Sequence, residues 1–235
     1  LALVGPDTEA DAEGLCGVRR GDDGELTQTS ARSGGPDPTY LAVHPSLDVL
    51  YAATRPGERA EIVSFAVDHE AGSLSRLDAV DTGGGETPCY CSVDATGQVL
   101  LVAHYTGGAV SATPLDADGS FGDTTLTEHE GSGADPERQE SAHPHSIVPG
   151  PDNEYVYVPD LGADQVVVYD LDPAEATLAR AGTIPLQAGA GPRHLDFTPD
   201  GGRAVLINEL DATVTLFARE ADGNLRELDS ADTLA

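Results

Sequence analysis

The fold is decided by two stretches that follow one template, PHSIVPGPDNEYVYVPDL (144–161) and PRHLDFTPDGGRAVLINEL (192–210). Each begins with Pro and continues as a short run of alternating apolar residues, which is typical of a β-strand. A turn rich in Pro, Asp, Asn and Gly follows, and a second apolar run returns from it. Each stretch therefore predicts an antiparallel pair of strands.

The same template occurs twice upstream, as PTYLAVHPSLDVLYAATR (38–55) and PCYCSVDATGQVLLVAHY (88–105). The four copies begin at residues 38, 88, 144 and 192, so the chain repeats about every fifty residues. A third apolar run and then a polar fourth run follow each copy. The third runs are EIVSFAV (61–67), AVSATPL (109–115), QVVVYDL (165–171) and TVTLFAR (213–219). Four short antiparallel strands in a repeat of this length are typical of a β-propeller blade.

We therefore predict an all-β chain, a single β-propeller domain over residues 1–235 with about five blades. Residues 1–33 supply three strands, which match the second, third and fourth strands of a blade. Successive full blades cover 34–83, 84–140, 141–188 and 189–235. Because the chain stops directly after the fourth strand of the last blade and has no initiator Met, we expect a fragment or an incomplete product of a longer propeller.

The composition is strongly acidic. The chain has 41 Asp plus Glu against 12 Lys plus Arg, a formal net charge of −29, and all the basic residues are Arg. The acids are scattered along the chain, which favours the adapted surface of a halophilic protein. Such a surface repels polyanions, so we expect no nucleic-acid partner. No apolar run is long enough to span a membrane, so we expect no membrane association.

The cysteines indicate the redox compartment. Cys16, Cys89 and Cys91 are too few and too ill-spaced for a disulfide framework or a zinc site. Cys89 and Cys91 are two residues apart, so we expect them to share one face of a strand as small buried side chains. The acidic opening residues lack the pattern of a signal peptide. A reducing cytoplasm is the predicted location.

Polar residues recur at two positions of the template. The position after the template Pro holds Thr39, Cys89, His145 and Arg193, and the end of the second strand holds Thr54, His104, Asp160 and Glu209. In a propeller the first strand lines the channel and the second runs back beside it, so such pairs should meet at one sheet end. The later blades then bring an imidazole, a guanidinium and carboxylates to one channel mouth. This set can perform acid–base catalysis, although structural ion pairs would have the same pattern.

The other histidines carry weaker signals. His44, His69 and His129 fall in predicted turns or exposed segments, so we expect them to be solvated. His194 follows Arg193 and should point to the opposite face of the strand, in a supporting role. His143 and His145 form an HxH pair, but no third ligand lies at a suitable spacing, so no metal site is predicted.

Three segments resemble the lactonase family of seven-bladed propellers: SAHPHSIVPGPDNEYVYVPDLGADQVVVYDLD (141–172), GAGPRHLDFTPDGGRAVLINELDATVTLF (189–217) and PTYLAVHPSLDVLYAA (38–53). The family includes cycloisomerase-type 6-phosphogluconolactonases and the 3-carboxy-cis,cis-muconate lactonizing enzyme. The resemblance covers essentially the whole chain, and its most specific parts are HPH, GPRH and NEL. It implies that His145, Arg193 and Glu209 are catalytic, the same three residues that the repeat positions indicate.

Two positions depart from the family's usual pattern. Thr54 and Arg55 stand where relatives have Asn and Glu, which removes a channel carboxylate. An imidazole, His104, replaces an amide before Tyr105. The substrate-binding residues predicted around the catalytic three are His104, Tyr105, His143, Asp160, His194 and Asn208.

The leading functional hypothesis is the hydrolysis of a sugar lactone, above all 6-phosphogluconolactone. Arg193 would orient the anionic substrate or stabilise the oxyanion, while Glu209 or His145 activates water. No metal or other cofactor is required, and a small-molecule substrate is the expected partner; the oligomeric state stays open. The alternatives are a lactonizing cycloisomerase that uses the same site and a non-catalytic propeller that binds a partner.

Overall fold

The computed structural model describes residues 2–4, 14–32, 38–55, 59–85 and 87–234. Their strands form five antiparallel sheets, which we call blades A to E. Blade A contains β1 (Ala2–Val4), β2 (Leu15–Arg20) and β3 (Leu26–Arg32). Blade B contains β4 (Tyr40–Val43), β5 (Val49–Thr54), β6 (Glu61–Asp68) and β7 (Ser73–Asp81). Blade C contains β8 (Pro88–Val93), β9 (Val99–His104), β10 (Ala109–Pro114) and β11 (Thr125–Glu128).

The last two blades repeat the pattern. Blade D contains β12 (Val148–Pro149), β13 (Tyr155–Asp160), β14 (Gln165–Asp172) and β15 (Thr177–Pro185), with a single 3₁₀ turn, η1 (Leu161–Ala163), after β13. Blade E contains β16 (Pro192–Phe197), β17 (Arg203–Asn208), β18 (Thr213–Arg219) and β19 (Leu225–Asp232). In blades B to E each strand pairs with its neighbours in sequence. The predicted propeller of four-stranded antiparallel blades is confirmed.

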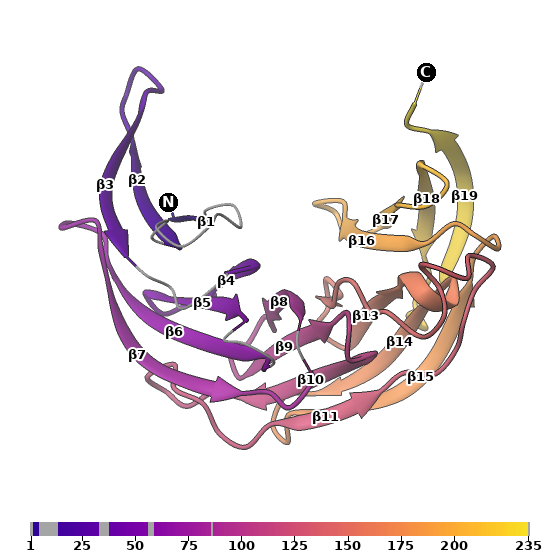
Figure 1. Ribbon diagram of the computed structural model, residues 1–235, viewed down its shortest axis with the longest axis horizontal. Helices are drawn as coiled ribbons and strands as arrows, with labels where there is room; N and C mark the ends of the chain where they lie inside the picture. The colour runs from indigo at the N-terminus through magenta and orange to yellow at the C-terminus, as the bar shows by residue number, and fades with distance from the viewer. Residues whose placement is uncertain (1, 5–13, 33–37, 56–58, 86, 235) are drawn as a thin grey trace.

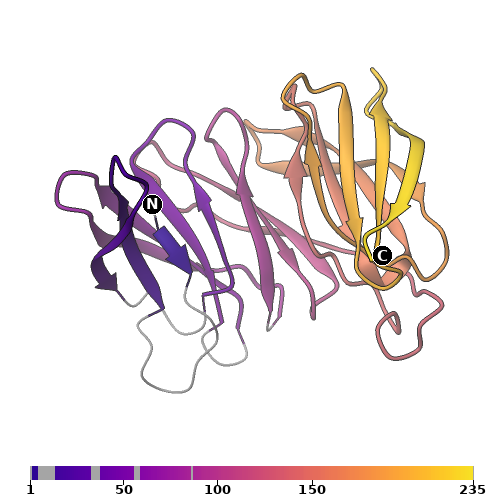
Figure 2. The same ribbon diagram turned by 90° about the horizontal axis from the view of Figure 1, so that it is seen from above.

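The blades follow one another around an open arc (Figure 1). The first strands β4, β8 and β16 lie on its inner side, and the fourth strands β7, β11, β15 and β19 lie on its outer side. Blades A and E stand at the two ends of the arc in both views (Figure 2). Residues on the first strands of different blades are thereby brought to one inner edge.

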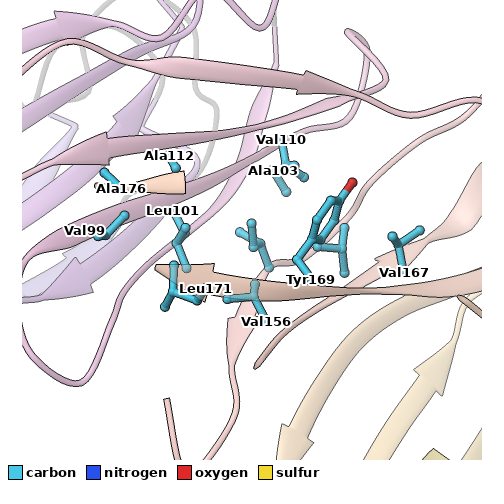
Figure 3. Packing of buried hydrophobic residues seen from close by; sticks show 12 residues of the cluster. Val99, Leu101, Ala103, Val110, Ala112, Val156, Val167, Tyr169, Leu171 and Ala176 are labelled. Atoms are coloured by element: carbon cyan, nitrogen blue, oxygen red, sulfur yellow. The ribbon is translucent and has the colours of Figure 1, made fainter. Parts of the chain in front are cut away.

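Apolar side chains fill the space between adjacent blades. Between blades C and D, Val99, Leu101 and Ala103 from β9 pack with Val156 from β13 and Tyr169 from β14 (Figure 3). β5 and β9 are buried along their whole length because each has a neighbouring blade on both faces. β17 instead alternates between exposed and buried residues, so only one of its faces is covered.

The turn between β4 and β5 contains a histidine whose predicted exposure is wrong. His44, predicted to be solvated, is buried in the β4–β5 turn against Gly97 of blade C. Its Nδ1 accepts hydrogen bonds from the backbone N–H groups of Ser46 and Leu47, so Nε2 carries the proton and donates it to the Gly97 carbonyl at 3.0 Å. The imidazole thereby joins blades B and C. His69 is exposed, as predicted, beside Asp48.

β-bulges change which way several side chains point. The register shifts between Pro88 and Tyr90, and again between Pro192 and His194. Cys89 and Cys91 therefore do not share a face as predicted: Cys89 packs between blades C and D, and Cys91 between blades B and C. Both are free thiols, and burial raises the pKa of each to about 12. The side chain of Cys16 lies outside the described residues.

In the part of the chain that the structure describes, no helix has the length and apolar character needed to cross a bilayer.

Candidate active site

One carboxylate at the inner edge of blade E is held by two guanidinium groups. Arg193, the bulged residue of β16, donates from Nη1 to Oε2 of Glu209, which follows β17. Arg138 donates from Nη2 to Oε1 of the same carboxylate at 2.5 Å. The side chains of Arg193 and Arg138 are 41% and 43% exposed, against 23% for Glu209. The predicted pairing of Arg193 with Glu209 is present, and Arg138 adds a second cation to it.

Sequence reasoning missed Arg138 because it lies in the irregular segment between β11 and β12, where strand periodicity carries no information. A signal was nevertheless available. The chain has only twelve basic residues against 41 acids, so an Arg outside the regular strands is expected to pair with a carboxylate.

A line of stacked and edge-on rings runs along the same inner edge. The ring centroids of His145 and Tyr105 are 5.2 Å apart, and those of His145 and His194 are 5.4 Å apart. His143 stacks on Tyr105 at 4.5 Å. On the other side His194 meets Tyr90 at 5.3 Å, and Tyr90 in turn stacks on Tyr40.

This line corrects the orientation expected of His194. A regular strand would turn it away from the face of Arg193, but the bulge at Arg193 takes up one residue and brings His194 to His145. Tyr40 and Tyr90 were not predicted as site residues, although both occupy the template position of His194. The structure thus brings together five of the predicted residues, namely Tyr105, His143, His145, His194 and Arg193, with Glu209 bound to the last of them.

His145 is a neutral imidazole with an unused nitrogen. Burial, reinforced by the charge of Arg193, lowers its pKa to about 4. Its Nδ1 is buried and has no hydrogen-bond partner. Burial first and Arg193 second also lower the pKa of His194. Both rings are therefore uncharged at neutral pH, and His145 can accept a proton.

Glu209, unlike the neutral His145, is held in its charged form. Partial burial would raise its pKa, but hydrogen bonds and charge from Arg138 and Arg193 outweigh that cost and hold the pKa below its usual value. The carboxylate therefore stays ionised. Because each of its oxygens accepts a hydrogen bond from a guanidinium, it orients two cations.

Three other predicted residues point into the sheets. His104, Asp160 and Asn208 are 0%, 0% and 3% exposed, and they pair with Pro88, Pro144 and Pro192 respectively. This register corrects the predicted pairing: Asn208, not Glu209, is the counterpart of His104 and Asp160, and Glu209 is the counterpart of Tyr105. The one-residue offset decides which side chain reaches the inner edge.

The hydrogen bonds of these three residues are internal. His104 pairs through Nε2 with the hydroxyl of Ser111, and Asn208 donates to Thr213 and Thr215. Asp160 accepts the backbone N–H of His143 at 2.7 Å. These side chains therefore serve the sheets and do not face the inner edge. Asp160 instead fixes the backbone of the segment that carries the HPH motif.

His129 also departs from expectation, since it is buried rather than solvated. Its Nδ1 lies 2.9 Å from Oδ2 of Asp160, and its Nε2 lies 2.9 Å from the hydroxyl of Tyr169. The Asp160 carboxylate thus connects His129, next to β11, with His143 before β12. This network fixes both ends of the segment that carries Arg138.

Among the described residues, no group of three or more His, Cys, Asp and Glu side chains is arranged to hold a metal ion. In the HxH pair, Nδ1 of His143 lies 2.8 Å from the carbonyl oxygen of Tyr105. A groove of about 350 Å³ lies between blades A and B and includes none of the predicted site residues.

Comparison with known proteins agrees with this architecture. The family described as "Lactonase, 7-bladed beta-propeller" matches residues 1–235. The chain is 32% identical to the 6-phosphogluconolactonase of Bacillus subtilis, over 82% of this chain and 54% of that protein. It is also 32% identical to the 6-phosphogluconolactonase of Pectobacterium atrosepticum, over 83% of this chain and 54% of that protein. The chain thus spans about half the length of these relatives.

Solved structures give the same result. A periplasmic gluconolactonase from Pseudomonas aeruginosa superposes with a TM-score of 0.92 at 34% identity, over 100% of this chain and 68% of that one. A putative 6-phosphogluconolactonase from Bacteroides fragilis superposes with a TM-score of 0.89 at 31% identity, over 98% and 67%. The repeated blades, the motifs at the inner edge and these likenesses place the chain in the lactonase family of seven-bladed β-propellers.

Proposed function

We propose that this chain carries the active site of a hydrolase that opens a sugar lactone, with 6-phosphogluconolactone as the favoured substrate. The observation that carries the proposal is the arrangement at the inner edge: a neutral His145 beside Arg193, whose guanidinium is held by Glu209. The names of the relatives support the same chemistry. A base and a fixed cation are what ester hydrolysis by water requires.

His145 is the better candidate for the general base. Of the two residues that sequence left open, Glu209 is engaged by two guanidinium groups, whereas His145 is kept neutral by burial and by the charge of Arg193. Water would attack the lactone carbonyl carbon while His145 takes its proton. When the tetrahedral intermediate collapses, the bond between the carbonyl carbon and the ring oxygen breaks, and the same proton passes to that oxygen. The product is the open hydroxy acid.

Arg193 supplies the electrostatic part of this mechanism. Negative charge develops on the carbonyl oxygen as the intermediate forms, and a guanidinium fixed beforehand stabilises it without reorganisation. Glu209 keeps Arg193 in place. The cation also disfavours a protonated His145, so it keeps the base in its active form.

The test is to purify the chain in high salt and to measure opening of 6-phosphogluconolactone above the spontaneous rate. We expect His145→Gln, Arg193→Ala and Glu209→Gln to lose most of the activity. Arg226→Gln is the matched control, since its side chain is 61% exposed and pairs with Glu220 away from the site. Equal rates in all variants would overturn the mechanism.

Product analysis with an unsaturated dicarboxylate decides between hydrolysis and the alternative cycloisomerase. Lactone formation from that substrate, without opening of the sugar lactone, would replace our proposal by a lactonizing reaction. Absence of both reactions in a folded chain would favour a binding propeller.

We also infer that the chain works in the cytoplasm of a salt-adapted cell. The free thiols of Cys89 and Cys91 and the net charge of −29 support this inference. Screening by salt weakens repulsion between surface acids, so the melting temperature should rise as potassium chloride increases from about 0.1 M to about 2 M. A melting temperature that falls over this range would contradict salt adaptation.

A further inference from the structure

Two of the twelve basic residues in this acidic chain converge on a single carboxylate at the inner edge. Glu209 can neutralise only one of the two guanidinium charges, so the trio keeps a net positive charge. Each Arg contacts Glu209 through one nitrogen, and both side chains are about two-fifths exposed. Arg138 therefore retains donors that face water.

The position of Arg138 is fixed by its own segment. The Oδ1 atom of Asp135 accepts the backbone N–H groups of Glu137 and Arg138, at 2.9 and 3.1 Å. The next residue, Gln139, is only 1% exposed, and its Nε2 donates to the carbonyl of Leu161. The Arg138 side chain thus extends from a backbone that is hydrogen-bonded on both sides.

Gln139 also helps to fix Glu209, the partner of Arg138. Gln139 also donates to Oδ1 of Asp164 at 2.7 Å, and that oxygen accepts the N–H of Gly191 at 2.9 Å. The carbonyl of Gly191 in turn accepts the N–H of Glu209 at 2.8 Å. One buried carboxylate, Asp164, therefore sets both the segment of Arg138 and the segment that ends in Glu209. Such a pre-organised pair of cations suits recognition of a bound anion.

We propose that Arg138 is a substrate-binding residue that binds the anionic group of the lactone and so sets the preference for charged over neutral lactones. This inference rests on the proposed hydrolysis and adds a specificity residue to it. Glu209 keeps the two guanidinium groups apart and aligned before the substrate arrives. Arg193 acts at the reacting carbonyl or beside it, while Arg138, which contacts neither His145 nor His194, acts on the substituent.

A purely stabilising role does not account for the ion pair between Arg138 and Glu209. Partly exposed pairs contribute little to stability, and Arg193 alone already neutralises Glu209. The contact of Arg138 with the hydroxyl of Tyr105, at 3.4 Å, places it against the ring that meets His145. Arg138 is therefore next to the proposed reacting centre.

The experiment compares 6-phosphogluconolactone with the uncharged glucono-1,5-lactone in the wild type, Arg138→Gln, Arg138→Lys and the control Arg226→Gln. A lost charge-assisted contact predicts that Arg138→Gln raises KM for the phosphorylated lactone about tenfold or more. KM for the neutral lactone should stay within about twofold, and Arg138→Lys should be intermediate because it keeps the charge but loses the fork. Arg226→Gln should match the wild type.

Two results would overturn the inference. An equal loss of kcat on both lactones in Arg138→Gln would mean that Arg138 acts only by holding Glu209. An unchanged KM for both lactones would mean that Arg138 does not bind the substrate. If the wild type opens neither lactone, the proposed hydrolysis fails, and binding of 6-phosphogluconate by calorimetry then tests Arg138 alone. Weaker binding to Arg138→Gln would support its role as an anion contact, whereas equal binding, or none to the wild type, would refute it.

Discussion

The ring of Tyr105 meets the imidazole of His145 edge-on, with 5.2 Å between their centroids, while its hydroxyl lies 3.4 Å from Nη2 of Arg138. One side chain from the end of β9 thus touches both the proposed base and the second guanidinium. The same ring also stacks on His143. Tyr105 therefore holds the orientation of rings that come from a different blade.

This contact predicts unequal effects of two substitutions. Tyr105→Ala removes the ring and should lower kcat/KM about tenfold or more, because an edge-to-face pair contributes about 1 kcal/mol and its loss also frees His145 to rotate. Tyr105→Phe keeps the ring and should stay within about threefold of the wild type. Steady-state kinetics on the proposed substrate, 6-phosphogluconolactone, measures both. A Phe variant as impaired as the Ala variant would show that the hydroxyl, not the ring, is the group that matters.

The pKa of His145 predicts the acid side of the pH profile. The base is lost only when His145 is protonated, so kcat/KM should fall with a midpoint near pH 4 and not near the ordinary 6.5. Arg193 contributes to this lowered pKa, so the residual activity of Arg193→Gln should have a midpoint shifted upward. Rates measured from about pH 3.5 to pH 7.5 test both points. A wild-type midpoint near 6.5 would exclude His145 in this role.

His104 predicts how stability depends on pH. Burial lowers its pKa to about 4, so between pH 6.5 and 4 the unfolded chain binds a proton that the folded chain does not. Its contribution is therefore complete above pH 6.5 and decreases as pH falls, by an amount on the order of 3 kcal/mol at the lower end.

Denaturant unfolding of the wild type and of His104→Asn, at pH 7 and pH 4.5, measures this loss. The variant should be less stable at pH 7 but should lose less on acidification. His145 and His194 have lowered pKa values too, so some loss should remain. Equal losses in the two proteins would contradict the assignment to His104.

The imidazole of His104 also leaves no room beside Gly84. A Cβ atom at residue 84 would lie 2.2 Å from Cγ of His104, so Gly84→Ala must displace a fully buried ring. We expect a loss of about 1–3 kcal/mol in the free energy of unfolding. Gly182→Ala is the matched control, because nothing lies within 4 Å of its added Cβ, and its effect should stay within about 0.5 kcal/mol. Similar losses for both would show that the ring moves freely.

The fold could be predicted from sequence because its information is repeated. The alternation of side chains and the turn residues recur at residues 38, 88, 144 and 192, so each blade supports the interpretation of the others. His145 and Arg193 could be singled out for the same reason, since both follow the template Pro, whereas Glu209 was aligned one residue away from its structural counterparts.

The rest depended on single-residue features that periodicity does not record. The bulge at Arg193 turns His194 toward His145. Asn208 occupies the buried position opposite Pro192, so Glu209 lies one residue further along the chain. Arg138 came from a segment whose course is set by individual hydrogen bonds to Asp135 and Gln139. His44 and His129 were predicted to be solvated because turns usually are, yet each is buried.

The alternating burial of β17 has a consequence for the order in which the blades unfold. Val205 and Ile207 are 39% and 43% exposed, so β17 has less apolar cover than β5 and β9, which are buried along their whole length. A strand with fewer buried apolar contacts opens locally at a lower cost in free energy. Amide hydrogens of β17 and β18 should therefore exchange faster than those of β9. Because Arg193 lies on β16 and Glu209 follows β17, heating should abolish the proposed lactonase activity before the central sheets unfold.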